Sequence, residues 1–224
     1  MLMAEKLARW THKLKYSDLT PQAIHEVKRR VIDSLGTALG AYHSKAATIA
    51  RNTAKQNQVS SGGAVIVGTP YRAAPDLAAF ANGAAVRYLD YNDTYLSKEP
   101  AHPSDNIPAT LAAAQSANRS GKDFILATVI AYEIQCRLCD AASLRKYGWD
   151  HVTYGAFSAS LGAAKLWGLS VDEMIHAQGL AGVCNIATRQ TRTGQISLWT
   201  ACAFSNAARN ALFAPNLARQ AFTG

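Results

Sequence analysis

The sequence predicts one mostly α-helical domain over residues 1–224. Helical patterns follow one another along the chain, and strands do not alternate with helices as they do in a doubly wound sheet. Neither GxGxxG after a strand nor GxxxxGKS/T occurs, so loops that cradle phosphates are not indicated. Because 49% of the 224 residues are hydrophobic and 17% are charged, the chain can bury a core without disulfides or a metal.

The first half of the chain opens with two predicted helices. Residues 1–15 are amphipathic, and Thr20 followed by Pro21 is typical of an N-cap and the first helical position. Apolar residues then recur at helical spacing from Ile24 to Leu39, which predicts a buried stripe. Further patterns predict helices over 46–56, 76–89 and 108–118, a short strand over 64–67 and a turn-rich stretch over 90–108.

The second half is predicted to be helical between short loops. From Phe124 to Ile134 the chain is apolar on most sides, as expected of a helix in the middle of a bundle. Small residues such as Gly155 indicate close helix contacts, and Ser170 with Glu173 forms a capping-box pattern. The predicted helices span 122–142, 152–169, 170–183 and 198–213.

The charge balance favours anionic partners. Lys and Arg number 23 and Asp and Glu number 15, which gives a net charge of +8 with neutral histidines. The basic residues are spread along the chain and form no stripe with interleaved aromatic residues. We therefore expect an acidic small molecule rather than a nucleic acid.

Several segments argue against membranes, export and metals. The longest aliphatic stretch, 124–132, is shorter than a membrane span of about 20 residues. The N-terminus lacks the architecture of a signal peptide, so the expected location is the cytoplasm. Cys136 and Cys139 form a CxxC inside a helical pattern, without a second CxxC or a histidine pair at finger spacing. We predict no membrane partner and no metal.

The turn-rich stretch holds the first candidate site. Asp90, Thr94, His102 and Ser104 fall in one segment between two predicted helices, where functional side chains are common. The helix that starts near Pro108 presents free amides and a partial positive charge, which suit a carboxylate. The alternative is that the Asp, Asn and Ser residues here only turn and cap the chain.

A second candidate is His151, which lies in a loop next to Asp150. A neighbouring carboxylate orients an imidazole for acid–base work, whereas the alternative is an ordinary exposed histidine. Arg189 and Arg192 follow in a later loop and offer a fork for a carboxylate. The alternative interpretation is that both arginines only belong to a solvated basic loop.

Taken together, four segments resemble the MmgE/PrpD family, which includes 2-methylcitrate dehydratase, cis-aconitate decarboxylase and an iminodisuccinate epimerase. The segments are Leu89-Asp-Tyr-Asn-Asp-Thr94, His102-Pro-Ser-Asp-Asn106, Ile196-Ser-Leu-Trp199 and Ala201–Asn210. The resemblance extends over nearly the whole chain. It implies a multi-helix bundle of the kind that forms the family's large domain, without the smaller α/β lid domain that members also have.

The resemblance assigns roles to matching positions. Asp90, His102 and His151 correspond to acid–base residues of the active site, with Asp90 orienting a histidine. Thr94 belongs to the same set and is implied to bind substrate. The resemblance implies no cofactor and, in particular, no iron–sulfur cluster.

Substrate binding is further expected from Ser104, Arg192 and Thr200. Thr200 departs from the family pattern, because many members carry a lysine directly after the tryptophan of this motif. The exchange removes a fixed positive charge from a site for anions, which lowers affinity by about ten- to a hundredfold.

The implied function is a lyase of the 2-methylcitrate dehydratase type that acts on citrate-like polycarboxylates by acid–base chemistry. Decarboxylation or epimerisation of the same substrate class, or a helical fragment without catalysis, are the alternatives left open. The expected partners are a small polycarboxylate, a second copy in a homodimer and a separate chain that supplies the lid.

Overall fold

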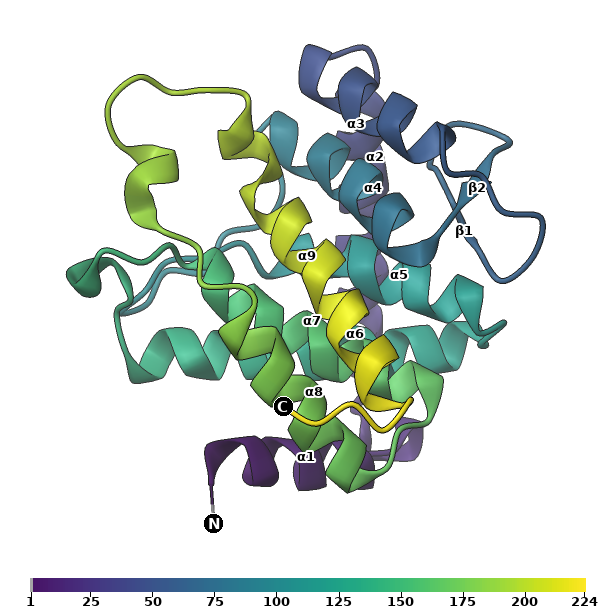
Figure 1. Ribbon diagram of the computed structural model, residues 1–224, viewed down its shortest axis with the longest axis vertical. Coiled ribbons are helices and arrows are strands. Elements are labelled where there is room, and N and C mark those ends of the chain that lie inside the picture. Colours follow the sequence, from purple (N-terminus) through teal and green to yellow (C-terminus); the bar gives the residue numbers. More distant parts are fainter. Residues whose placement is uncertain (1) are drawn as a thin grey trace.

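The computed structural model describes residues 2–224 and is mostly α-helical, which confirms the predicted fold class (Figure 1). Within this range the only sheet is an antiparallel pair of two-residue strands. No helix in the same range is long and apolar enough to cross a membrane. The elements are α1 Met3–Lys13, α2 Pro21–Gly40, α3 Lys45–Lys55, β1 Ala64–Val65, β2 Arg72–Ala73, α4 Pro75–Tyr88, α5 Ile107–Ser116, α6 Gly121–Ala141, α7 Val152–Trp167, α8 Val171–Val183 and α9 Trp199–Ala218, with short 3-10 turns that include η2 Pro103–Asn106 and η4 Arg189–Arg192.

The helix starts follow the capping signals in the sequence. Thr20 caps α2 by accepting a hydrogen bond from the amide of Ala23 at 3.1 Å. Ser170 and Glu173 form the expected capping box at α8, since each side chain accepts the other's backbone N–H. These bonds satisfy amides that a helix start leaves without an intrahelical partner.

The core is built from small residues that let helices approach closely. In Figure 1, α9 crosses in front of α4 and α7, and both helices contact it. A Cβ atom built on Gly155 of α7 would lie 2.3 Å from the ring of Phe204 in α9. Glycine is therefore required at this crossing, as the sequence pattern indicated.

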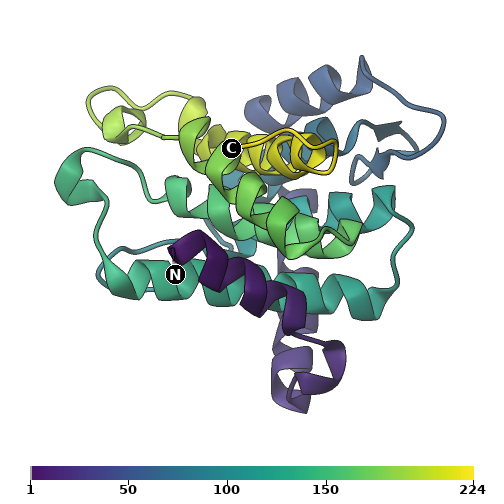
Figure 2. The same ribbon diagram turned by 60° about the horizontal axis from the view of Figure 1, so that its bottom comes forward.

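The buried stripe predicted for α2 is partly wrong. Ile32 is 72% exposed and Leu39 is 55% exposed, whereas Ser34 and Thr37 are buried. Figure 2 shows α2 standing out from one side of the bundle. The helix buries Val27, Ser34, Thr37 and Ala38 against its neighbours, whereas Ile32 and Leu39 face outward.

The predicted strand and the last helix also differ in their limits. Only Ala64 and Val65 of the predicted strand pair with β2, and the chain turns after Ile66, whose carbonyl accepts from Thr69 N–H. Asn82 of α4 binds this segment: its Oδ1 accepts from Val67 N–H and its Nδ2 donates to the Val65 carbonyl, both at 2.9 Å. Helix α9 continues to Ala218 and includes Pro215, beyond the predicted end at 213.

Three loops meet at one side of the bundle and form the site. The loop between α4 and η2 folds back on itself through paired backbone bonds between Tyr95 and Ala101. The loop before α7 pairs with the loop after α8, where the amide of Asp150 donates to the Ala187 carbonyl at 2.8 Å. This pairing brings side chains from distant parts of the sequence together.

Candidate active site

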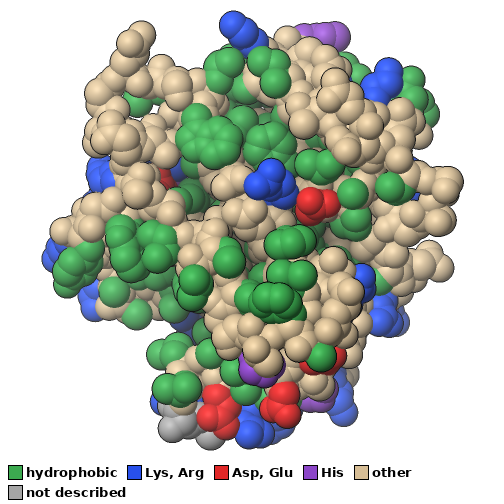
Figure 3. Space-filling view, viewed as in Figure 1, with side chains coloured by type: hydrophobic (Ala, Val, Ile, Leu, Met, Phe, Trp, Pro, Cys, Tyr) green, Lys and Arg blue, Asp and Glu red, His purple; other side chains and the backbone are tan. Residues whose placement is uncertain are grey.

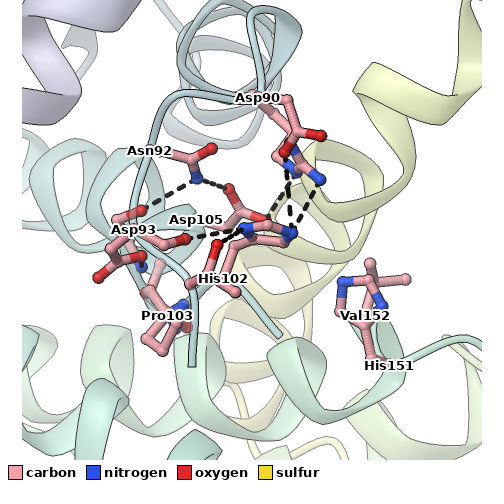
Figure 4. A network of polar contacts seen from close by, with 12 residues as sticks. Asp90, Asn92, Asp93, His102, Pro103, Asp105, His151 and Val152 are labelled. Atoms are coloured by element: carbon pink, nitrogen blue, oxygen red, sulfur yellow. Dashed lines mark hydrogen bonds and ion pairs between the residues drawn. The ribbon is translucent and has the colours of Figure 1, made fainter. Parts of the chain in front are cut away.

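His102 lies directly before η2 and is held from both sides of its ring (Figure 4). Its Nδ1 is 2.7 Å from the backbone carbonyl of Asp93, and its Nε2 is 2.9 Å from Nη2 of Arg87. A guanidinium only donates, so Nε2 accepts this bond and the ring proton sits on Nδ1. Burial and then the charge of Arg87 lower the pKa of His102, which favours the neutral ring.

Arg87, in the last turn of α4, contacts most of the polar side chains around His102. Its side chain is only 10% exposed and contacts His102, Asp90 and Asp105. The pair with Asp90 is a direct hydrogen bond, and Nε lies 3.8 Å from Oδ2 of Asp105. Arg87 does not stand out in the sequence, because a cation in the last turn of a helix is ordinarily explained by the helix dipole.

Asp105 is a buried carboxyl behind Arg87. Its Oδ1 accepts a hydrogen bond from Asn92 Nδ2 at 2.7 Å, and its enclosed Oδ2 has no hydrogen-bond partner. Burial raises the pKa of Asp105 to about 7, against the opposing charge of Arg87. This carboxyl therefore exchanges its proton near neutral pH.

The predicted residues Asp90, Thr94 and Ser104 surround His102 in different ways. Asp90 sits at the surface, 69% exposed, with a left-handed φ of 56° that Asp tolerates, and its Oδ1 is 4.0 Å from His102 Nε2. Thr94 Oγ1 is 3.4 Å from His102 Nδ1. Ser104 is fully buried, and its Oγ accepts a hydrogen bond from Asn92 at 3.0 Å.

Asp93 fixes the loop that carries His102. Its Oδ1 accepts from the Ser104 amide and its Oδ2 from the hydroxyl of Tyr132 in α6, both at 2.9 Å. The carbonyl of the same residue accepts the His102 ring proton. Asp93 and Tyr132 therefore position His102. Asp93 lies within the candidate loop predicted from the sequence, whereas Tyr132 was not predicted.

His151, at the start of α7, is held by a carboxylate instead. Its Nδ1 is 3.0 Å from Oδ1 of Asp150, whose Oδ2 accepts a hydrogen bond from Nε of Arg192 at 2.7 Å. Burial alone would raise the pKa of Asp150, but the hydrogen bonds and charges of His151 and Arg192 outweigh it and lower this pKa to about 2. The Nε2 atom of His151 is buried and has no partner.

The two histidines are brought together, with ring centroids 6.0 Å apart. Figure 4 shows them arriving from different segments, His102 on the loop and His151 beside Val152 at the start of α7. Nε2 of His102 is bonded to Arg87, and Nε2 of His151 is enclosed without a partner. The sequence prediction of two candidate histidines thus resolves into one cluster.

An open pocket of about 560 Å³ adjoins this cluster. Its polar lining comes from Arg87, Asp90, Ser197 and Thr200, and its apolar lining includes Ile196, Leu198 and Ala201. Figure 3 shows hydrophobic side chains exposed on the upper part of this face, where α9 begins. Thr200 donates its hydroxyl to the Thr191 carbonyl at 3.2 Å, so at rest this group is engaged within the protein.

Charges in the cluster are mixed. Carboxyl groups come from Asp90, Asp93, Asp105 and Asp150, and fixed cations come from Arg87 and Arg192. Each arginine is already paired with a carboxylate. A polyanion therefore binds here only by displacing a carboxylate, by proton uptake or with cations supplied from elsewhere. Among residues 2–224, no three His, Cys, Asp or Glu side chains converge in a way that could hold a metal ion.

The structure thus places two histidines near each other, among aspartates and arginines, on a mostly helical domain. Residues 5–224 match the family model described as the MmgE/PrpD N-terminal domain. The chain belongs to the MmgE/PrpD family, as the motifs in the sequence indicated.

Curated relatives agree with this assignment. A 2-methylcitrate dehydratase from Escherichia coli (strain K12) is 33% identical over 199 residues, which cover 82% of this chain and 41% of that protein. A probable 2-methylcitrate dehydratase from Saccharomyces cerevisiae is 32% identical over 208 residues, covering 84% of this chain and 40% of its own. A cis-aconitate decarboxylase-like protein from Aspergillus oryzae is 29% identical over 231 residues, with 98% and 47% covered. The chain thus spans less than half the length of each of these relatives.

Proposed function

We propose that this chain is the helical domain of a lyase of the 2-methylcitrate dehydratase type, which removes water from a citrate-like polycarboxylate. Family membership and the names of the relatives support the reaction class. The observation that carries the proposal is the pair of imidazole rings, whose centroids lie 6.0 Å apart and whose supports have opposite charge.

The proposed chemistry uses the outer nitrogen of each ring. Dehydration removes a proton from the carbon next to a carboxylate and expels a hydroxyl from the neighbouring carbon with a second proton. His102, which is held neutral, takes the first proton at Nε2, and His151 delivers the second from Nε2. Asp90, through its contact with Arg87, helps to hold His102 in place.

Substrate carboxylates are proposed to bind the cations and hydroxyls around the pocket. Arg192 is anchored by two hydrogen bonds to Asp150 and presents charge beside His151. Thr200 supplies a hydroxyl group within the pocket, and Thr94 supplies one beside His102. Ser104, which is enclosed, contributes through its hydrogen bond with Asn92 rather than by direct contact.

Assembly is the second part of the proposal. We propose a homodimer in which exposed apolar residues of α2, such as Ile32 and Leu39, are covered. A lid-like segment, from the same polypeptide or a separate chain, closes the open pocket and excludes water from it. Light scattering of the purified protein tests the dimer, which a monomeric mass would contradict.

The function is tested by incubating the purified protein with 2-methylcitrate and with cis-aconitate and following the products by NMR. An unsaturated tricarboxylate from 2-methylcitrate supports dehydration. Loss of carbon dioxide from cis-aconitate would instead support the decarboxylation that the name of the Aspergillus relative suggests.

Variants decide whether the site described here performs the reaction. His102→Ala and His151→Ala are each expected to abolish turnover, because each removes a group that moves a proton. His25→Ala, on the exposed side of α2, is the matched control and should retain activity. Turnover that persists in both site variants would contradict the assignment.

A further inference from the structure

Arg87 donates a hydrogen bond directly to the ring of His102. Its Nη2 is 2.9 Å from Nε2, and a guanidinium has no acceptor, so Nε2 accepts this bond. The bond occupies the lone pair that a base needs. His102 as observed is therefore in the correct tautomer but cannot accept a proton at Nε2.

Two carboxylates hold the guanidinium in different ways. Asp105 lies behind Arg87 with its side chain only 2% exposed, and its Oδ2 is 3.8 Å from Nε. Asp90 lies at the pocket, 69% exposed, and binds Nη1. The buried partner stays in place, whereas the exposed one can be replaced by another carboxylate at little cost.

We propose that Arg87 is a positioning residue that occupies Nε2 of His102 and blocks it until a substrate carboxylate binds Nη1 and Nη2 of the guanidinium. This inference rests on the proposed function for the identity of the incoming carboxylate. A carboxylate that binds Nη1 and Nη2 together displaces both Asp90 and His102, because the two parallel hydrogen bonds use the same two donors. Nε2 of His102 is then free to take a proton from the bound substrate.

The pocket supports this exchange. Arg87 and Asp90 both line the open space of about 560 Å³, so an anion reaches the fork without rearrangement of the helices. The ring of His102 does not move when the fork turns away, since the Asp93 carbonyl still holds Nδ1. The block and its release therefore involve only the end of one side chain.

Several charged groups from different elements surround the ring of His102. The ring is faced by Arg87 from α4, Asp90 and the Asp93 carbonyl from its own loop, and His151 from the start of α7, while Asp105 and Arg192 act through Arg87 and Asp150. Of these, only Arg87 donates a hydrogen bond to Nε2. Substitution of Arg87 is therefore expected to change the ¹⁵N signals of the His102 ring.

The test is a ¹⁵N NMR titration of the histidine rings in the full chain. In the unsubstituted protein near neutral pH we expect His102 to carry its proton on Nδ1 and to show Nε2 as an unprotonated acceptor. In Arg87→Gln we expect the titration midpoint of His102 to move to higher pH, because a cation is removed from the ring. The ring proton should stay on Nδ1 in this variant, because the Asp93 carbonyl still accepts it.

Arg145→Gln is the matched control. Arg145 also pairs with a buried carboxylate, that of Glu99, but it contacts no histidine. This variant should leave the His102 midpoint unchanged. A proton on Nε2 in the unsubstituted chain, or an equal midpoint in Arg87→Gln, would overturn the positioning role. The protonation state of Nε2 in the unsubstituted chain tests the positioning role even if the Arg87 variant does not fold.

Adding citrate tests the release. At saturation we expect the His102 midpoint to rise toward that of Arg87→Gln, since the fork has been taken by citrate. Citrate that binds without moving this midpoint would overturn the release. If citrate does not bind at all, both the proposed function and the release of His102 Nε2 from Arg87 are contradicted. The positioning role of Arg87 is still tested by the titration without ligand.

Discussion

His102 and His151 are the same residue type in one cluster, yet their surroundings are opposite. His102 faces a guanidinium at Nε2 and a peptide carbonyl at Nδ1. His151 has a carboxylate at Nδ1 and no partner at Nε2. The two surroundings act differently on the rings, because burial and then a cation lower the pKa of His102, whereas an anion orients His151.

The two buried aspartates near these rings, Asp105 and Asp150, have pKa values shifted in opposite directions. Burial raises the pKa of Asp105 to about 7, whereas the partners of Asp150 lower its pKa to about 2 despite burial. Asp105 meets Arg87 only at 3.8 Å, while Asp150 is held directly by His151 and Arg192. Close pairing therefore decides whether a buried carboxyl is ionised, and the following predictions test this difference.

The largest effect is expected for Asp105→Asn. The pKa of Asp105 is raised in the folded state, so the native protein loses stability as pH rises from about 4, the unfolded value, to about 7. The neutral amide removes this loss and is expected to raise the free energy of unfolding above neutral pH by up to about 4 kcal/mol. Asn92 keeps its hydrogen-bond partner in the variant, because the oxygen of the introduced side-chain amide can accept from Asn92 Nδ2 as Oδ1 of Asp105 does.

Urea unfolding at several pH values measures this effect. The unsubstituted protein should become less stable between about pH 4 and pH 7, and the variant should show a flatter profile. A variant that is less stable than the original protein above neutral pH would show that Asp105 is ionised and well paired, like Asp150.

Asp150→Asn should have the opposite effect. The pKa of Asp150 is lowered, so its contribution to stability is present above about pH 4 and is lost as pH falls toward about 2. Removing the charge near neutral pH leaves Arg192 and His151 without their anion and should cost about 3 kcal/mol of unfolding free energy.

Asp90→Asn is the matched control for Asp150, since Asp90 also pairs with an arginine but is 69% exposed. Its loss should cost less than about 1 kcal/mol. Equal losses for the two variants in urea unfolding would remove the distinction between the buried and the exposed pair.

Thr200→Lys adds a cation to the pocket on the side of Arg87. A hydrogen bond to a charged group is worth about 1.5–3 kcal/mol, so the affinity for citrate should rise by about ten- to a hundredfold. Calorimetry measures the dissociation constant, with Ser197→Lys in the same pocket as the control. Equal gains in both variants would indicate attraction by net charge alone.

Ser170→Ala shows how a change in stability far from the site compares with the changes within it. The serine closes the capping box of α8, and its loss should reduce the free energy of unfolding by about 1 kcal/mol. Citrate affinity and the titration of His102 should stay as they were. A change in either would show that the stability of α8 and the geometry of the site are coupled.

Most of the fold follows from local signals in the sequence. Thr20 and Ser170 begin their helices as predicted, because a cap depends only on residues within one turn. The outward face of α2 did not follow, because periodicity shows which residues share a face but not which neighbour covers it. The continuation of α9 through Pro215 likewise depends on packing rather than on local preference.

The candidate site was predictable where its residues are close in sequence. Asp90, Thr94 and His102 share one loop, and the structure brings them to one ring. Arg87 was not predictable, since its direct contact with a histidine requires a fold that turns the loop back over α4. The pairing of Arg192 with Asp150 joins two loops separated by α7 and α8 and leaves no local signal.

The most direct test of the account is to add citrate to the isotopically labelled chain and follow the ring signals of both histidines. One polycarboxylate site predicts that the signals of His102 and His151 shift together and saturate with a single dissociation constant. Shifts confined to one histidine, or no shift of either, would contradict the conclusion that the two rings form one site.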